Sequence, residues 1–407
     1  MRIGKLLFWV LMMCPLAVAG QEADKGALRA EQVFSLLLKG PADSLYTQLS
    51  EKMQAALTPA QLTGLMPQLE QMAGAYKEHG DWKRVEGAAD FLVYASPITF
   101  EQGQFSMTIA FDDAYVVQGM HIVPVLAADD KEPLTDTAIE LDDTVRTGDV
   151  ALPAKVVLSG QTASPPIVVL VHGSGALDRD ETVMANKPFR DLTYRLAEQG
   201  ISTLRYDKRT FAYRKPVDSM EDETIADALS AIALARTYNS KVYLLGHSLG
   251  AMLAPIIASR AALAGIVMMA APARDLPEVV REQMDYLSDA ETTAQQKAEA
   301  IDKIRQQSPH YFQPQHQVEA ACGLNLPMLI LQGERDYQVT MTDFRLWQEA
   351  LKNKENVAYC SYPSLNHLFL EGEGKSTPQE YMKKGSMPQQ VIDDIARFIN
   401  RHSTPQQ

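Results

Sequence analysis

The sequence predicts an α/β protein, in which a small α+β domain precedes a doubly wound, mostly parallel sheet. From about residue 146 onward, short apolar segments alternate with helical patterns, which is typical of an open sheet with helices on both faces. One of these segments, 166–171, is almost wholly apolar, as strands of a parallel sheet are when both faces are buried. Before residue 124 the order differs, because helical patterns come first and strand patterns follow.

The composition of the chain excludes several classes of protein. A chain of 407 residues with 46% hydrophobic residues is long enough for two domains and too apolar for a disordered protein. A net charge of −13 argues against a nucleic-acid groove or a polybasic membrane patch. Three cysteines exclude a disulfide scaffold and a Cys-rich metal site, and the spacing of Cys322 and Cys360 leaves open whether they pair.

Residues 1–20 predict a secretory signal peptide. Arg2 and Lys5 precede an apolar run that ends in small residues suited to cleavage, so we expect an exported protein, periplasmic or extracellular. A retained anchor and a lipid-modified Cys14 are alternatives, but the apolar run is short for a membrane span. No later stretch approaches the roughly 20 apolar residues of a transmembrane helix, so no stable span is expected after signal removal.

The small domain is predicted at 26–123. Apolar residues recur every three or four positions up to about Leu69, which indicates helices, and Thr58-Pro59 fits an N-cap followed by Pro at the first helical position. Beyond Gly80 the period changes, and strands are predicted at 90–94, 105–111 and 116–117. Nothing in this domain predicts catalysis. An acidic linker at 124–145 should lead into an edge strand.

The larger domain is predicted at 146–402. Its strands are expected at 166–171, 201–206, 241–245, 264–269, 328–332 and 356–361, and its helices at 189–199, 225–238, 250–258 and 391–400. In such a sheet, function lies at the carboxyl ends of the strands. An insertion at about 273–323 is charged, Gln-rich and helical in pattern, and we predict that it forms a cap over that edge. The alternative is a surface insertion without a functional role.

The segment Gly246-His247-Ser248-Leu249-Gly250 matches G-x-S-x-G between an apolar strand and a helix. This is the setting of a nucleophile elbow, in which Ser248 is the attacking group. The glycines fit because the elbow strains the serine backbone and packs its neighbours closely. A glycine-rich turn with an ordinary serine is the alternative.

A serine nucleophile needs a base oriented by a carboxylate, in the chain order Ser, acid, His. His367 directly follows the last strand and is the predicted base, whereas His402 lies in a polar tail. Asp336 follows the strand at 328–332 in a G-x-x-D-x-x-V pattern and is the predicted acid, with Glu334 as the alternative.

The oxyanion hole is predicted from two backbone N–H groups. Ser174 follows the first long buried strand and Leu249 follows the nucleophile, so their N–H groups could converge on the tetrahedral oxygen. His172 precedes Ser248 in the chain and is expected to brace the loop. No metal or organic cofactor is needed for this chemistry.

These motifs together resemble the α/β-hydrolase superfamily, in the branch of bacterial secreted esterases and serine aminopeptidase-like hydrolases. The resemblance covers roughly 146–402 and rests on the segments 172–175, 246–250, 333–336 and 366–367. It implies an α/β-hydrolase fold with a helical cap. The front domain resembles a small domain of unknown function that often precedes such hydrolases.

Three further segments resemble family motifs near the pocket rim, namely 178–182, 186–189 and 205–209. Asp207 and Arg209 are expected to form a structural salt bridge with each other, or else to contact substrate. Thr210 stands where many relatives place Gly, which should alter loop shape only.

The sequence thus predicts a serine hydrolase that cleaves a small-molecule acyl ester through an acyl-enzyme. A serine exopeptidase is the closest alternative, because the cap offers carboxylates for a free amine terminus at Asp275, Glu278, Glu282 and Asp285. A hydrolase-fold binding protein without activity is a third. No nucleic-acid partner is expected, and the oligomeric state stays open.

Overall fold

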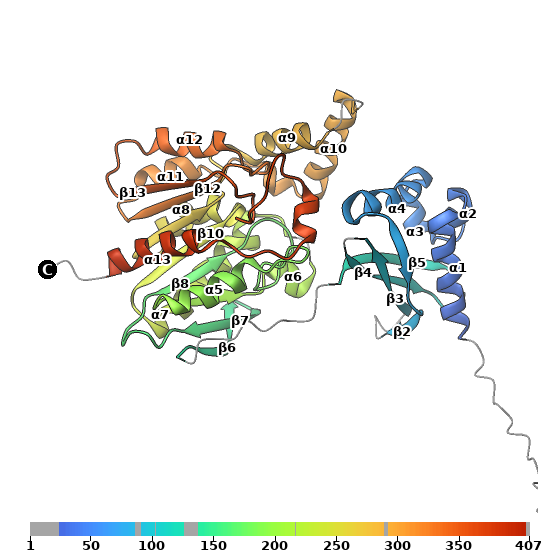
Figure 1. The fold of residues 1–407 in the computed structure, drawn as a ribbon, viewed down its shortest axis with the longest axis horizontal. Coiled ribbons are helices and arrows are strands. Elements are labelled where there is room, and N and C mark those ends of the chain that lie inside the picture. Colours follow the sequence, from blue (N-terminus) through green and yellow to red (C-terminus); the bar gives the residue numbers. More distant parts are fainter. Residues whose placement is uncertain are drawn as a thin grey trace, which may run out of the picture. The chain divides into compact units, whose positions relative to one another are not determined.

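The computed structural model divides into two compact units, Met1–Val125 and Leu126–Gln407 (Figure 1). The structure describes residues 24–85, 91–101, 103–125, 137–215, 217–288 and 292–403. The predicted signal peptide and Cys14 lie outside these residues, as do residues 126–136 of the predicted linker. Within the described residues, no helix combines the length and the apolar character needed to cross a membrane.

In the part of the first unit that the structure describes, four helices combine with an antiparallel sheet. Its strand order is β1-β3-β4-β5, with β2 also paired to β3. The elements are α1 (Lys25–Lys39), α2 (Ala42–Tyr46), α3 (Glu51–Ala56), α4 (Pro59–Ala73), β1 (Tyr76–His79), β2 (Lys83–Val85), β3 (Leu92–Phe100), β4 (Gln104–Phe111) and β5 (Val117–Pro124).

Local sequence explains this unit. Thr58 and Gln61 form a reciprocal capping box and Pro59 occupies the first turn, so the predicted start of α4 is confirmed. In β4 every second side chain, from Phe105 to Phe111, is buried, as expected of a strand with one face on the core. Phe34 of α1 packs edge-on against Tyr76 and Trp82.

The second unit is built on an eight-stranded sheet of order β13-β12-β11-β10-β8-β9-β7-β6. The six strands from β8 to β13 run parallel, and the hairpin β6–β7 adds an antiparallel edge. Their bounds are β6 (Ile139–Thr147), β7 (Val150–Leu158), β8 (Ile167–Val171), β9 (Ser202–Tyr206), β10 (Val242–His247), β11 (Gly265–Met269), β12 (Met328–Gly333) and β13 (Val357–Tyr362). The predicted doubly wound, mostly parallel sheet is confirmed.

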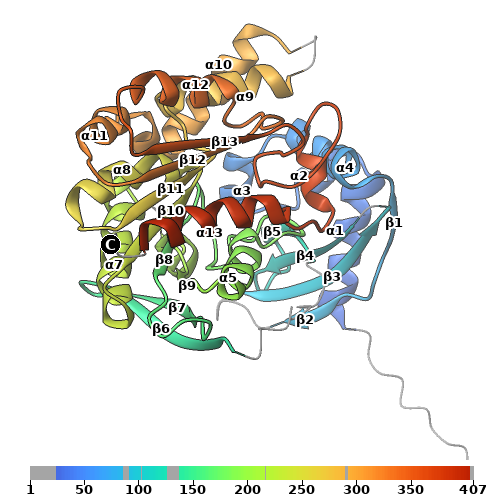
Figure 2. The ribbon, with the colours of Figure 1, turned by 60° about the vertical axis from the view of Figure 1, so that its left-hand side comes forward.

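Helices cover both faces of this sheet (Figure 2). Helices α7, α8, α11 and α12 pack on one face, and α5 and α13 on the other. The helical segments are α5 (Pro188–Glu198), α6 (Arg209–Tyr213), the π-helix η1 (Glu221–Ile225), α7 (Ala226–Tyr238), α8 (Leu249–Arg260), α9 (Leu276–Leu287), α10 (Ala294–Gln307), the 3₁₀ turn η2 (Pro309–Phe312), α11 (Gln317–Gly323), α12 (Met341–Ala350), the 3₁₀ turn η3 (Pro378–Met382) and α13 (Gln389–Ser403).

The central strand β8 shows why its sequence is continuously apolar. Ile167, Val169 and Val171 belong to the core beneath α7 and α8. Val168 and Leu170 belong to the core beneath α5 and α13. All five side chains are fully buried, so neither face of the strand tolerates a polar residue.

Two predicted boundaries need correction. Strand β6 begins at Ile139, inside the predicted linker 124–145, and pairs along its whole length with β7. Most of its side chains are exposed or half-buried, which is why an acidic edge strand was indistinguishable from a linker by composition. The predicted cap 273–323 also extends too far, because α11 packs against α8 and buries Ala321 in the core.

Candidate active site

Ser248 lies at the junction of β10 and α8 with φ +53° and ψ −116°. Such a backbone is strained for a residue with a side chain and is typical of a nucleophile elbow. The flanking glycines are required by close backbone approach. A Cβ at Gly246 would lie 2.3 Å from the carbonyl oxygen of Gly250, and a Cβ at Gly250 would lie 2.2 Å from that of Val171.

The structure brings the predicted acid and base together. Nδ1 of His367 lies 2.7 Å from Oδ2 of Asp336, and both residues are buried. Because the carboxylate only accepts hydrogen bonds, Nδ1 carries the proton and Nε2 is left as the basic nitrogen. The other carboxylate oxygen accepts from the N–H groups of Gln338 and Val339 at 2.7 and 3.0 Å. The turn formed by these two hydrogen bonds explains why the acid stands at the Asp position of the G-x-x-D-x-x-V pattern.

The alternative acid and base lie apart from this pair. Glu334 is exposed and accepts a hydrogen bond from the Ser361 hydroxyl at 2.8 Å. His402 lies near the end of α13, with its ring packed edge-on against Phe398.

Asn366 shapes the loop that carries His367. Its fully buried side chain accepts from the N–H groups of Leu368 and Leu370 at 3.1 and 3.2 Å. Its amide donates to Glu380 at 2.9 Å. The Asn-His pair therefore has a structural reason, since the asparagine holds the turn that presents the base.

His247 connects the elbow to the base. Its Nε2 donates to the carbonyl oxygen of His367 at 2.9 Å, and its Nδ1 lies 3.1 Å from Oε1 of Glu181. Both partners accept, so both ring nitrogens carry protons. Burial opposes the charged ring, but the Glu181 carboxylate outweighs burial, and the pKa of His247 is raised. Burial raises the pKa of Glu181, but the charge and hydrogen bond of His247, together with the Gly173 N–H, outweigh burial, and the pKa is lowered.

The predicted oxyanion loop is in contact with the elbow. A Cβ at Gly173 would lie 3.3 Å from the Cβ of Ser248. The N–H of Gly173 donates to Glu181 at 2.7 Å, and that of Gly175 to the Tyr311 hydroxyl at 3.2 Å. Among the described residues, the N–H of Ser174 has no such partner. Leu249 begins α8, where the helix leaves the N–H without an internal acceptor.

His172 is a buried structural residue. Its ring packs edge-on against Tyr206, with centroids 5.4 Å apart, and lies 5.2 Å from the ring of Phe189. Burial lowers the pKa of His172 to about 4, so the ring is neutral at pH 7. This packing agrees with the predicted role of bracing the loop.

The expected pairing of Asp207 with Arg209 is wrong. Asp207 accepts two hydrogen bonds from the Arg179 guanidinium, at 2.9 and 3.0 Å. Arg209 makes its own bidentate pair with Asp227 on α7. The two residues lie on either side of a strand-to-helix turn, so their side chains meet different neighbours. Thr210 lies beside the predicted oxyanion loop, with its hydroxyl 3.4 Å from the carbonyl oxygen of Gly175.

Sequence reasoning missed a set of buried and half-buried polar residues around the predicted oxyanion loop. Glu181 and Lys208 lie in segments expected at the pocket rim, yet each is at most 2% exposed. Glu223, His310 and Tyr311 complete the set. Membership of recognised motifs could have drawn attention to Glu181 and Lys208. The other three residues lie in no quoted motif, and folding alone brings them together.

Two of the four cap carboxylates are engaged in ion pairs. Glu282 pairs with Arg274, and Asp285 pairs with Lys297 at 2.8 Å. Asp275 and Glu278 are exposed, as is Asp285. Arg274 also pairs with the fully buried Asp343, which anchors the start of the cap to α12.

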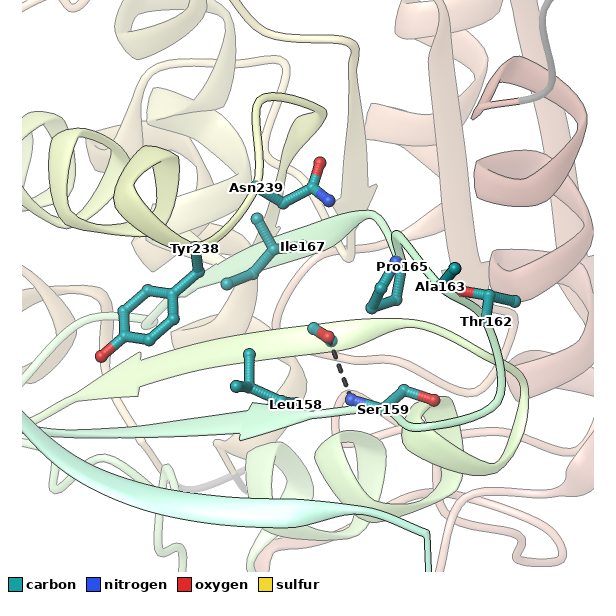
Figure 3. Close-up of a pocket in the computed structure, with 9 residues that line it drawn as sticks. Leu158, Ser159, Thr162, Ala163, Pro165, Ile167, Tyr238 and Asn239 are labelled. Atoms are coloured by element: carbon teal, nitrogen blue, oxygen red, sulfur yellow. Dashed lines mark hydrogen bonds between the residues drawn. The ribbon is translucent and has the colours of Figure 1, made fainter.

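A cavity of about 200 Å³ lies at the other edge of the sheet (Figure 3). It opens at the amino ends of β8 and β9, and Ser159, Tyr238 and Asn239 supply polar groups to it. Its lining residues include no histidine or carboxylate, so it lacks the base and acid that a serine nucleophile needs.

Comparisons with known proteins agree with the division into two units. Residues 30–120 match a family described as a protein of unknown function (DUF3887), and residues 168–321 match the alpha/beta hydrolase family. The chain is 34% identical over 379 residues to esterase EstD of Thermotoga maritima, covering 88% of this chain and 91% of that protein.

Solved structures similar to this chain include the esterase Pf2001 of Pyrococcus furiosus. It has a TM-score of 0.49 and 16% identity, covering 68% of this chain and 95% of that one. A proline iminopeptidase of Mycobacterium smegmatis has a TM-score of 0.43 and 17% identity, covering 64% and 98%. The family match and the relationship to EstD over most of both proteins show that this chain belongs to the α/β-hydrolase family and carries an N-terminal domain of unknown function.

Proposed function

We propose that this protein is a serine esterase that cleaves small carboxylic esters through an acyl-enzyme, with Ser248, His367 and Asp336 as its triad. The observation that carries the proposal is the strained backbone of Ser248. Strain of this kind persists only where the surrounding structure enforces it. The residue before this serine, His247, hydrogen-bonds the backbone of His367, whose ring is held by a buried carboxylate, and this arrangement supports the triad.

In the proposed mechanism, His367 removes the proton of Ser248 as the hydroxyl oxygen attacks the ester carbonyl. Asp336 holds the imidazole in the required tautomer and stabilises the imidazolium that forms. The N–H groups of Ser174 and Leu249 donate to the developing oxyanion. The tetrahedral intermediate then collapses, and His367 protonates the leaving alcohol. Water attacks the acyl-enzyme in the same way and releases the acid.

The relationship to an esterase supports an ester as the substrate class. The state of the cap carboxylates supports it further. Recognition of a free amine terminus needs an unpaired carboxylate close to the site, whereas Glu282 and Asp285 form ion pairs with Arg274 and Lys297, and Asp275 and Glu278 are exposed to solvent. An ester substrate makes no such demand, so we favour the esterase over the exopeptidase.

A fluorophosphonate probe tests the nucleophile. The wild type should be labelled, and Ser248→Ala should not be. Ser259→Ala is a matched control, because the Ser259 hydroxyl bonds the carbonyl of Ile256 on the same helix and is expected to leave labelling unchanged. Failure to label the wild type, or equal labelling of Ser248→Ala, contradicts the proposal and favours a binding protein.

A paired substrate panel tests the reaction class. We expect p-nitrophenyl acyl esters to be hydrolysed with higher kcat/KM than aminoacyl p-nitroanilides. Acyl chains of several lengths then define the preferred ester. A clear preference for the anilides overturns the esterase in favour of the exopeptidase.

We also propose that the protein is exported by cleavage of residues 1–20. Expression of the full chain in a bacterial host should yield a periplasmic or extracellular form that begins at Gln21 by mass spectrometry. An uncleaved form in the membrane fraction supports a retained anchor instead. A lipid adduct on Cys14 supports a lipoprotein.

A further inference from the structure

The cap reaches the oxyanion loop through one hydroxyl. Tyr311 lies in η2, between α10 and α11, and its OH accepts a hydrogen bond from the N–H of Gly175 at 3.2 Å. The same OH donates to Oε1 of Glu223 at 2.8 Å. A phenol that accepts from one group and donates to another has a fixed orientation, so Tyr311 holds the far end of the loop in one place.

A buried lysine holds the near end. Nζ of Lys208 donates to the carbonyl oxygen of Gly173 at 2.8 Å and to Oε1 of Glu223 at 2.5 Å. Lys208 and Glu223 are each 2% exposed, so this ion pair is removed from water. Burying a lysine ammonium group costs free energy unless its charge is paired. Here Glu223 pairs the charge, and the other hydrogen bond of the ammonium group goes to the Gly173 carbonyl in the oxyanion loop.

Glu223 joins these contacts into one cluster. Its two oxygens accept from Lys208, Tyr311 and Nε2 of His310, the last at 2.7 Å. Burial raises the pKa of Glu223, but the charge of Lys208 and the hydrogen bonds from Lys208, His310 and Tyr311 together outweigh burial, and the pKa is lowered. Glu223 lies in the π-helix η1, a rare conformation that is frequently found at functional sites.

These contacts fall on both sides of Ser174. Gly173 is held through its carbonyl by Lys208 and through its N–H by Glu181, while Gly175 is held through its N–H by Tyr311. We propose that Tyr311, Lys208 and Glu223 are positioning residues for the ester hydrolysis, which hold the N–H of Ser174 toward the oxyanion and make the hole depend on the docked cap.

This inference rests on the proposed function, because it assigns the cluster to the oxyanion hole of that reaction. The physical reason is that a donor stabilises charge in the transition state only if it is held in place beforehand. A displacement of a reacting group by about 1 Å can already lower the reaction rate by about 10²-fold. Neither Tyr311 nor Lys208 touches the reacting atoms in this scheme, so both act through the position of Ser174.

The test is Tyr311→Phe, which removes one hydroxyl and keeps the ring. We expect kcat per active site, counted by fluorophosphonate titration, to fall about 10-fold, less than the 10²–10³-fold that loss of a whole oxyanion donor costs. KM for the same ester should change by less than about twofold, because ground-state binding uses the hole little. Unchanged kcat overturns the inference.

The matched control is Tyr238→Phe. Its hydroxyl also donates to a carboxylate, that of Asp143 at 2.5 Å, but Tyr238 lies at the amino edge of the sheet (Figure 3). We expect its kcat to stay at the wild-type value. An equal loss in Tyr238→Phe and Tyr311→Phe attributes the effect to general loosening of the fold and overturns the inference.

A trifluoromethyl ketone provides a readout that a merely structural role does not move. It adds to the active-site serine and places an oxyanion in the hole, so its inhibition constant should rise in Tyr311→Phe by the same factor as kcat falls. If kcat falls while the inhibition constant stays unchanged, the lost rate does not come from the oxyanion hole, and the inference is overturned.

A second variant removes the buried ion pair without leaving one charge alone. Lys208→Met combined with Glu223→Gln should lower kcat and weaken the trifluoromethyl ketone in parallel, as Tyr311→Phe does. A wild type that the fluorophosphonate does not label defeats the proposed function and this inference together. A labelled wild type with unaffected variants defeats this inference alone.

Discussion

The imidazole of His247 joins Glu181 to the backbone of His367. One ring nitrogen lies 3.1 Å from the Glu181 carboxylate and the other 2.9 Å from the His367 carbonyl oxygen. Glu181 in turn holds the N–H of Gly173 at 2.7 Å. His247 and Glu181 together thus link the predicted oxyanion loop, the turn around Ser248 and the loop that carries His367, and this linkage explains a histidine at the second position of the G-x-S-x-G motif.

His247→Gln should lower the stability of the second unit in a pH-dependent way. Loss of one partner of a buried ion pair costs about 3–5 kcal/mol. The raised pKa of His247 means that its contribution is complete below about pH 6.5, the unfolded value, and is lost as pH rises through the folded pKa. The lowered pKa of Glu181 means that its contribution is complete above about pH 4.5 and is lost as pH falls through its folded pKa.

The difference in unfolding temperature between wild type and His247→Gln should therefore be largest between about pH 4.5 and 6.5. Calorimetry across the range from pH 4 to 9 measures it. His121→Gln, at an exposed position of β5, serves as the control and should leave the profile unchanged. A difference that stays constant across this pH range contradicts the ion pair.

Asp336→Asn should lower kcat by about 10⁴-fold, because an amide no longer enforces the tautomer in which Nε2 of His367 is the base. Ester hydrolysis at neutral pH measures the effect. Glu334→Gln is the matched control and should retain nearly full activity, since Glu334 is exposed and contacts Ser361. If Glu334→Gln loses activity and Asp336→Asn keeps it, Glu334 and not Asp336 is the acid of the triad.

Gly250→Ala should destabilise the second unit strongly. Its Cβ would lie 2.2 Å from the carbonyl oxygen of Val171 and 2.6 Å from that of His172, and neither backbone atom can move easily. We expect a loss of roughly 3 kcal/mol or more by denaturant unfolding. Gly323→Ala is the control, because nothing lies within 4 Å of its added Cβ, and its effect should be small. Equal losses of unfolding free energy at the two positions would contradict the close contact between Gly250 and the Val171 carbonyl.

Cys322 and Cys360 should titrate as two thiols. Within the described residues, both are free, Cys322 exposed and Cys360 half-buried. Burial raises the pKa of the Cys360 thiol, so Cys322 should react faster with Ellman's reagent in the folded chain. The chain lacking residues 1–20, and so Cys14, should yield two equivalents after unfolding without reductant. No reaction before reduction indicates a disulfide instead.

The elements that could be predicted are those encoded by contiguous residues. The parallel strands are recognisable because burial on both faces requires apolar runs such as 167–171. The start of α4 could be predicted because Thr58 and Gln61 satisfy each other's backbone across one turn. The predicted edge strand was placed too late, because the first part of β6 has an exposed acidic face and so has the composition of a linker.

What the sequence determined by itself about this protein is a parallel sheet and the turns that follow its strands. The elbow around Ser248 and the turn around Asp336 are both defined by backbone contacts within a few residues, so a short motif suffices to specify them. Only the tertiary structure decided the partners of Asp207 and Arg209 and the cluster of Lys208, Glu223 and Tyr311. Their contacts join distant segments, 136 residues apart in the case of Gly175 and Tyr311. No local pattern specifies such partners, because which charged groups meet depends on how the whole chain packs.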